Sequence, residues 1–295
     1  MKHRQPFRVI KETAQDLKAD HGMGLAAGLA YYATLSLAPF LLVLLSLLGW
    51  IVQREAIGAE LVNQMRSLVG DAGAEIASSV IQQSAKSEHR GLASILSFAL
   101  LLVGASGLFV ELQNAVNTIW EVKPRPKQNL WGFLRTRVVS FGMVLGIGFL
   151  MLVSLGFSAV LSGLNAYLEN RFSGSSLLHK LLNEVLSFVI FASLFAAIFK
   201  YLPDAIISWR DVWIGAVATA VLFMAGKLAI GIYLGHSSVA SMYGAAGSIV
   251  AWLVWVYYSS LLLLVGAEFT QVHARRSGMG IRPSKHAIRA KSHSK

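Results

Sequence analysis

The residues that could carry out chemistry in this chain do not combine into a familiar catalytic or metal-binding motif. No two histidines join metal-ligand spacing to a neighbouring carboxylate; the eight lie at positions 3, 21, 89, 179, 236, 273, 286 and 293. The segment 104–108 lacks the second glycine of a nucleophile elbow, and neither common phosphate-binding glycine loop occurs. The chain has no cysteine. We therefore expect no enzymatic activity, no metal site and no cofactor.

One charged residue, Lys227, lies well inside an apolar segment. A buried ammonium group costs roughly 3 kcal/mol at the centre of a membrane helix, so such a residue is a functional candidate by default. The long stem of Lys227 would also let its ammonium group reach the outer membrane interface. Both interpretations stay open.

A second group of polar residues is expected where two membrane helices reach the cytoplasm. Glu111 and Glu268 directly follow charge-free segments, and the C-terminal end of a helix disfavours an anion. Each carboxylate is therefore expected to have a cationic partner, and Arg137 opens the next span at the same level. Asn114 shares a helical face with Glu111, and Asn117 lies beside it. The alternative is that these residues only fix the depth of the helices in the membrane.

The elements that must position these residues are predicted from composition. Of the 295 residues, 55% are hydrophobic and 14% are charged, with a mean hydropathy of +0.58, whereas roughly 25% are charged in an ordinary soluble domain. Charged residues are absent from 21–53, 91–110, 138–168, 185–199 and 228–267. A membrane helix needs roughly 20 residues, and a polar turn at 236–244 divides the last segment into two spans. The sequence predicts an all-α integral membrane protein whose six transmembrane helices lie near Leu25–Val52, Gly91–Val110, Val138–Tyr167, Leu181–Tyr201, Val212–Leu234 and Ala245–Ala267.

The predicted orientation follows from the positions of the basic residues. The segments outside the spans carry 19 Lys and Arg on one side of the membrane and 6 on the other. Cytoplasmic loops carry an excess of Lys and Arg, so both termini are expected in the cytoplasm. No cleavable signal peptide is expected, because the first apolar run is longer than the apolar part of a signal sequence.

Three regions are predicted along the chain. Residues 1–24 form an amphipathic cytoplasmic segment, whose helix either lies on the cytoplasmic leaflet or packs on the bundle. Residues 25–272 form the membrane domain. Residues 273–295 are basic and poor in apolar residues, and we expect this tail to be disordered.

The largest segment outside the membrane, 53–90, is expected on the outer side. Its apolar residues recur at helical spacing at Ile57, Leu61 and Met65. This pattern predicts two short helices with a turn near Gly70 that cap the bundle.

Close helix contacts are predicted from small residues. The motif of two glycines separated by three residues occurs at Gly24–Gly28, Gly142–Gly146 and Gly231–Gly235. In membrane helices this spacing favours close approach of two backbones.

Several short segments carry a resemblance to a known family. They are Ala-Ala-Gly-Leu-Ala-Tyr-Tyr at 26–32 with Ser-Leu-Ala-Pro at 36–39, Leu-Gln-Asn-Ala-Val-Asn-Thr-Ile-Trp at 112–120, Leu-Pro-Asp at 202–204 with Trp-Arg at 209–210, Tyr-Gly-Ala-Ala-Gly at 243–247, and Gly-Ala-Glu at 266–268. Their order and spacing are jointly specific. Over about residues 7–272 the chain resembles the YihY/virulence factor BrkB family, once described as ribonuclease BN.

The resemblance implies a six-helix protein of the bacterial inner membrane, described as a transporter or envelope-associated factor. Tyr31 and Tyr243, which lie in the matching segments, join the candidate site residues. The ribonuclease description is not expected to hold, because no acid–base or metal-binding group converges in the chain.

Two functions are retained as hypotheses. The first is the movement or gating of a lipid or other amphiphile, favoured by Lys227 and by a basic inner face suited to anionic lipid headgroups. The second is a non-transporting scaffold that binds an envelope-biogenesis protein through residues 53–90. No nucleic-acid partner is expected, and the oligomeric state is left open.

Overall fold

The computed structural model describes residues 5–48, 54–86, 107–125, 175–236, 246–277, 280–285 and 287–290. Within these residues the chain is mostly helical. The helices are α1 (Gln5–Ala19), α2 (Gly22–Leu48), α3 (Arg54–Val69), α4 (Asp71–Lys86), a helical segment over 107–119, α7 (Ser175–Tyr201), α8 (Trp209–His236) and α10 (Gly247–Arg276). The strands are β1 (Val122–Pro124), β2 (Ala205–Ile206), β3 (Arg282–Pro283) and β4 (Ala287–Arg289).

Four of the described helices are long and apolar enough to cross a membrane. The candidate spans are Gly22–Leu42 in α2, Glu184–Tyr201 in α7, Trp209–Ile230 in α8 and Gly247–Arg276 in α10. They coincide with the first, fourth, fifth and sixth predicted spans. The predicted second span lies outside the described residues except for 107–110, and the predicted third span lies wholly outside them.

Two helices run further than the predicted spans. The helical segment that contains Glu111 continues to residue 119, and α10 continues past Glu268 to Arg276. The charge-free segments 91–110 and 228–267 each end at a carboxylate. The helices continue beyond Glu111 and Glu268 because later residues on one side, such as Val116 and Val272, are still buried. Both carboxylates lie about two turns before the helix end. The predicted position of these two carboxylates at helix C-termini is therefore wrong.

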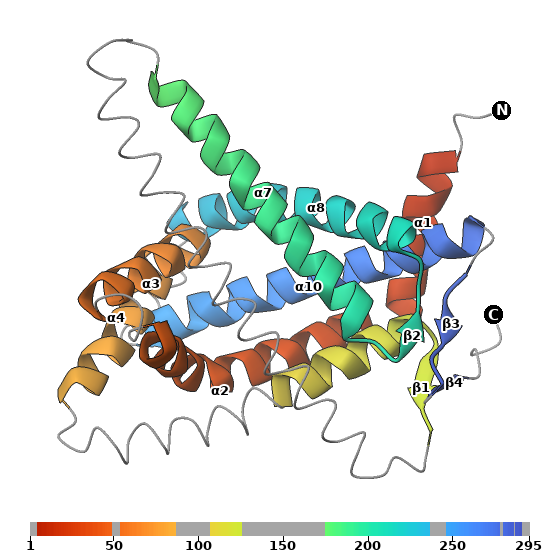
Figure 1. Ribbon diagram of the computed structural model, residues 1–295, viewed down its shortest axis with the longest axis horizontal. Helices are drawn as coiled ribbons and strands as arrows, with labels where there is room; N and C mark the ends of the chain where they lie inside the picture. The colour runs from red at the N-terminus through yellow and green to blue at the C-terminus, as the bar shows by residue number, and fades with distance from the viewer. Residues whose placement is uncertain are drawn as a thin grey trace.

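α10 is the central helix of the described bundle. It packs against α8, α2, α1 and α4, while α7 packs on α8 (Figure 1). The larger core cluster combines Phe109, Val116 and Trp120 with Phe199 of α7 and Leu264 of α10, among other residues. The residues of the candidate site lie around this cluster.

The contact between α8 and α10 is a reciprocal fit of glycine and threonine. A Cβ atom added at Gly215 would overlap Thr270, and one added at Gly266 would overlap Thr219. Each threonine hydroxyl donates to the carbonyl of the glycine four residues earlier in its own helix, over 2.7 Å. This bond satisfies the buried hydroxyl, and the missing Cβ of the opposing glycine makes room for the threonine side chain. Neither pair is among the double-glycine motifs predicted to form helix contacts.

The segment after α2 folds into a helical hairpin. α3 and α4 meet at Gly70, whose φ of +79° lies in the left-handed region that glycine adopts without a Cβ clash. The predicted apolar positions Ile57, Leu61 and Met65 are buried in a second core cluster with residues of α2 and α10. The prediction of two helices with a turn near Gly70 is confirmed.

At the end of the bundle away from α3 and α4, the four strands form two small antiparallel pairs (Figure 1). β1 pairs with β4, and β2 pairs with β3. The backbone N–H of Ser284 also donates to the carbonyl of Asp204 over 2.9 Å, and that of Ala290 donates to Glu121 over 2.7 Å. Residues 280–285 and 287–290 therefore connect two chain segments that are distant in sequence.

The predicted disorder of the tail over 273–295 is wrong for its described residues. Residues 273–276 are the last turn of α10, and Ser277 follows it. Residues 280–285 and 287–290 are ordered by backbone hydrogen bonds to the segments 121–124 and 204–206. Strands of two or three residues are too short to show an alternating apolar pattern. The low apolar content of the tail consequently gave no sign of this pairing.

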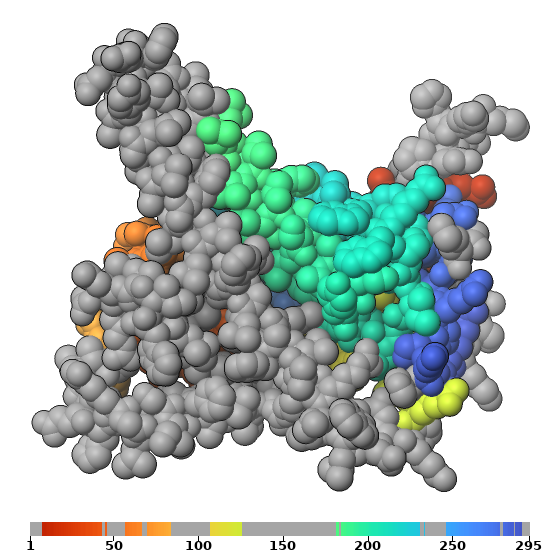
Figure 2. All heavy atoms as spheres, in the orientation of Figure 1, coloured from red at the N-terminus to blue at the C-terminus, as the bar shows by residue number. Residues whose placement is uncertain are grey.

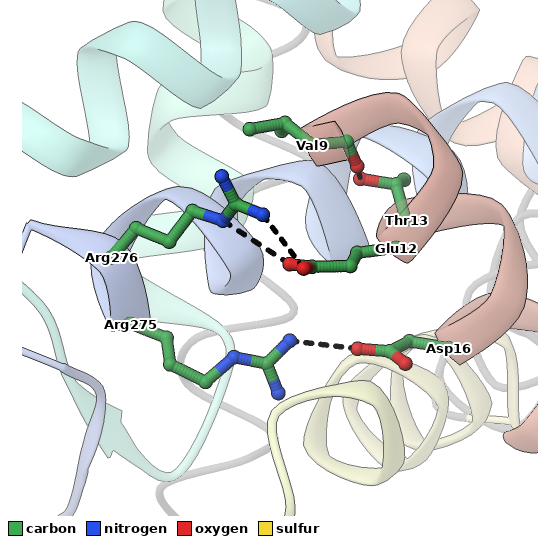
Figure 3. A network of polar contacts seen from close by, with 6 residues as sticks. All are labelled: Val9, Glu12, Thr13, Asp16, Arg275 and Arg276. Atoms are coloured by element: carbon green, nitrogen blue, oxygen red, sulfur yellow. Dashed lines mark hydrogen bonds and ion pairs between the residues drawn. The ribbon is translucent and has the colours of Figure 1, made fainter. Parts of the chain in front are cut away.

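α1 is held to the C-terminal end of α10 by two ion pairs (Figure 3). Arg276 donates to both carboxylate oxygens of Glu12, over 2.7 and 3.1 Å, and Arg275 donates to Asp16 over 2.8 Å. Ile10, on another side of α1, is exposed. α1 thus packs on the bundle, which is one of the two predicted arrangements, through these ion pairs and through Leu17, which packs against the larger core cluster.

Candidate polar site in the helix bundle

A buried hydrogen-bond network joins the helical segment 107–119 to the turn after α7. The amide of Asn117 accepts a hydrogen bond from the backbone N–H of Asp204 over 2.9 Å and donates to its carboxylate over 3.2 Å. Gln113 donates to the same carboxylate oxygen over 3.2 Å. Asn117 and Asp204 are only 3% and 5% exposed. Burial strengthens such bonds and makes the loss of either partner costly.

Trp120 continues this network toward α10. It is buried and its Nε1–H donates to the backbone carbonyl of Ala267 over 3.0 Å. The preceding helix and α10 are thereby fixed next to each other beside the glycine–threonine contact at Gly266. The next residue of α10 is Glu268.

Glu268 is a fully buried carboxylic acid on α10. Its relative exposure is 0%, and it lies between the buried residues Ala267 and Thr270 on α10. Removing an ionised carboxylate from water is expensive unless it is paired, hydrogen-bonded or protonated. A fully buried glutamate therefore marks a place where a proton or a cation has a large effect on the bundle.

Glu111 and Lys227 are half-buried at two other points. The Glu111 carboxylate lies over Gly28 of α2, where an added Cβ would be 2.9 Å from Oε1. Lys227 follows Gly226, whose missing side chain makes room for Tyr258 and Leu262 of α10. Among the residues that the structure describes, Lys227 has no hydrogen-bond or ion-pair partner. The buried and the snorkelling interpretations of Lys227 both stay predictions.

The structure does not gather all the predicted site residues into one cluster. Asn117 and Glu268 are buried near the α10 contact, whereas Asn114 and Tyr31 are exposed. Arg137 and Tyr243 lie outside the described residues. The predicted partnership of Arg137 with the two glutamates therefore stays a prediction.

Sequence reasoning missed Asp204, Gln113 and Trp120 as parts of the site. All three lie in segments that carry the family resemblance, but their partners are about 90 or more residues away in the chain. The available signal was a polar residue, Asp204, directly after a buried proline at the end of a membrane helix. Such a signal does not identify which distant residue it contacts.

The described residues contain no group of three or more histidine or acidic side chains that could hold a metal ion. What the arrangement offers chemically is a fixed polar network at one end of the bundle, with protonatable side chains at Glu111 and Glu268.

Comparison with known proteins places the sequence in a family. The profile of the virulence factor BrkB family matches residues 13–291. A UPF0761 membrane protein of Verminephrobacter eiseniae is 29% identical over 287 residues, covering 90% of this chain and 62% of the relative. Another of the same name, from Tolumonas auensis, is 29% identical over 254 residues, covering 83% of this chain and 78% of the relative. No solved structure matches the chain.

Proposed function

This chain belongs to the virulence factor BrkB family of membrane proteins, and from that premise we propose that it moves or gates a lipid or other amphiphile in the bacterial cytoplasmic membrane. The proposed form is a bundle of six transmembrane helices with both termini in the cytoplasm. No enzymatic step and no nucleic-acid partner is part of the proposal.

The proposed orientation is supported by where the basic segments meet. Ion pairs hold α1 to the end of α10, and strand pairs hold residues 280–290 to the segments 121–124 and 204–206. These are the segments whose Lys and Arg content predicts a cytoplasmic location. The hairpin of α3 and α4 lies at the other end of the bundle (Figure 1). The meeting of these basic segments at one end of the described bundle is what the positive-inside rule expects of a cytoplasmic face.

The observation that carries the proposal is the burial of ionisable residues within candidate membrane spans. Glu268 is fully buried in α10, and Lys227 is half-buried in α8. Ionisable residues at such positions are costly and mark substrate or proton pathways by default. An amphiphile suits a site of this kind because its polar headgroup would interact with these residues while its apolar chain stays in the hydrocarbon core of the membrane.

The scaffold alternative depends on the outer face of the α3–α4 hairpin. The described large apolar side chains of this hairpin are already packed in the cluster with α2 and α10. In the described part of α3 and α4, no large apolar side chain is exposed. A partner protein would therefore have to bind a polar surface there. Crosslinking from exposed Gln82 that captures one reproducible protein in native membranes would favour this alternative.

The proposal is tested in vesicles of defined composition that contain the purified protein. The movement of a fluorescent phosphatidylglycerol between leaflets is measured for the natural chain and for the variants Glu268→Gln, Lys227→Leu and Arg137→Ala. Glu75→Gln, on the exposed side of α4, is the matched control. We expect the control to behave as the natural chain and Glu268→Gln to slow movement about tenfold, a barrier change of about 1.4 kcal/mol. Unchanged movement in all three site variants, or no movement above protein-free vesicles, would overturn the proposal.

A further inference from the structure

An exposed apolar stripe runs along α8 from its first residue. Trp209, Trp213, Val217 and Val221 are each separated by four residues, and all four side chains are exposed. Residues four apart form a continuous ridge on a helix surface. This ridge is about 18 Å long at 1.5 Å per residue, which is close to the depth of one hydrocarbon leaflet, about 15 Å.

The foot of the stripe is an aromatic and cationic corner. Tyr201, at the end of α7, meets Trp209 edge to face with ring centroids 6.1 Å apart. The ammonium group of Lys200 lies 5.2 Å from the centre of the Trp209 ring and donates to the carbonyl of Ile207 over 2.7 Å. Aromatic rings with exposed edges and a neighbouring cation are typical of the level of lipid headgroups.

At this corner the carboxylates face the interior of the bundle and the cations face outward. Asp204 faces inward to Asn117, and Asp211 is buried and accepts a 2.7 Å hydrogen bond from Ser208, which caps α8. His273 is the other titratable group near Asp211, at 3.8 Å. Both carboxylates are thus turned away from the surface.

The outward side carries cations. Arg210 is exposed and has no hydrogen-bond or ion-pair partner among the described residues. Arg282 is also exposed and lies opposite Ile206 in the pairing of β2 with β3. Figure 2 shows the start of α8 and the adjoining end of α7 open at the surface of the molecule.

We propose that this corner binds one anionic phospholipid, with its phosphate at Arg210 and an acyl chain along Trp213, Val217 and Val221. Lys200 and Arg282 add positive charge around the headgroup, and Trp209 and Tyr201 flank it. Charge complementarity selects an anionic over a zwitterionic lipid, because no described carboxylate faces outward here. The inference rests on the membrane placement and orientation of the proposed function, but not on lipid movement.

The test measures bound lipid. The full chain is placed in nanodiscs in which phosphatidylglycerol is the minor lipid and phosphatidylcholine the major one, and the lipids retained after gentle detergent extraction are quantified by mass spectrometry. Arg210→Gln removes the unpaired cation. Arg66→Gln, which removes an exposed cation paired with Asp71 near the turn between α3 and α4, is the matched control. Thermal unfolding of each variant is measured alongside.

We expect the natural chain and Arg66→Gln to retain phosphatidylglycerol selectively. In Arg210→Gln the enrichment of phosphatidylglycerol should fall about fivefold, which is the effect of removing one cation near an anionic membrane surface. A large excess of soluble glycerol phosphate should not displace the lipid, because the stripe holds the chain. Equal enrichment in Arg210→Gln and the natural chain would overturn the proposal, as would an equal loss in Arg66→Gln. Displacement by glycerol phosphate would assign the site to free phosphate instead. Because only binding is read, a chain that moves no lipid in vesicles still gives a decisive result.

Discussion

At the residue scale, the buried polar side chains distinguish this bundle from a simple apolar one. Asn117 and Glu268 were predicted from sequence as site residues and are buried. Their neighbour Asn114 was predicted with them but is exposed. Three residues turn a helix by about 300°, which leaves the two side chains about 60° apart, and the edge of the buried side of this helix lies between them.

Replacing Asn117 by Ala should destabilise the protein by about 1–3 kcal/mol, because the buried carboxylate and the backbone N–H of Asp204 each lose the hydrogen bond to Asn117. Asn114→Ala, on the same helix but exposed, should change stability very little. Thermal unfolding of both variants in one detergent checks this. Equal shifts in the two melting temperatures would contradict the buried network.

At the element scale, helix existence was predictable and helix contacts were not. The repeat of Ile57, Leu61 and Met65 predicted α3, and Gly70 marked its turn, because both signals are local. The strands β3 and β4, and the bond from Trp120 to Ala267, depend on partners far along the chain. Local periodicity carries no information about such partners. The same holds for Gly215 and Gly266, which have threonine rather than glycine four residues later.

Gly266→Ala should destabilise the bundle by about 1–3 kcal/mol, because the new methyl group overlaps Thr219 across the helix contact. Gly24→Ala, in α2, meets nothing within 4 Å and should stabilise slightly, since alanine favours helix over glycine by about 1 kcal/mol. Chemical or thermal unfolding of the two variants gives the comparison. A stable Gly266→Ala protein would show that α8 and α10 do not approach closely at this point.

The docking of α1 should weaken in acid. Hydrogen bonds from Arg276 lower the pKa of Glu12 below its usual 4.5; burial and the charge of Asp16 oppose this shift, and the charges of Arg276 and Arg275 assist it. The contribution of Glu12 to stability is therefore fully present above its ordinary pKa, at about pH 4.5. It is lost as the pH falls through the lowered pKa of the folded protein. Its size is small because the pair is partly exposed.

A nitroxide attached through Lys18→Cys should report this change as increased mobility of α1 between about pH 6 and pH 3. In Glu12→Gln the mobility should already be raised at the higher pH and should change less on acidification. The ion pair of Arg275 with Asp16 remains in this variant and continues to hold α1 to α10. An identical pH profile in both proteins would show that Glu12 does not contribute to the pH dependence of α1 docking.

At the scale of the whole molecule, the basic segments converge on one end and the α3–α4 hairpin lies at the other (Figure 1). The sequence predicted which segments share a side, because the count of Lys and Arg is a property of the whole chain. It could not predict that residues 280–290 would join those segments by backbone pairing. Together, α1, the strand pairs and the end of α10 make one connected end of the molecule that contains Asp204 and adjoins Glu268.

The central claim, that this connected end faces the cytoplasm, is tested most directly by labelling single cysteines in a chain that has none of its own. Ser79→Cys on α4 and Lys285→Cys beside β3 are both exposed. In intact cells with a permeable outer membrane, a membrane-impermeant maleimide should label the Ser79→Cys protein at once. It should label the Lys285→Cys protein only after the inner membrane is disrupted. Immediate labelling of the Lys285→Cys protein in intact cells would contradict the orientation, and the functional account that depends on it.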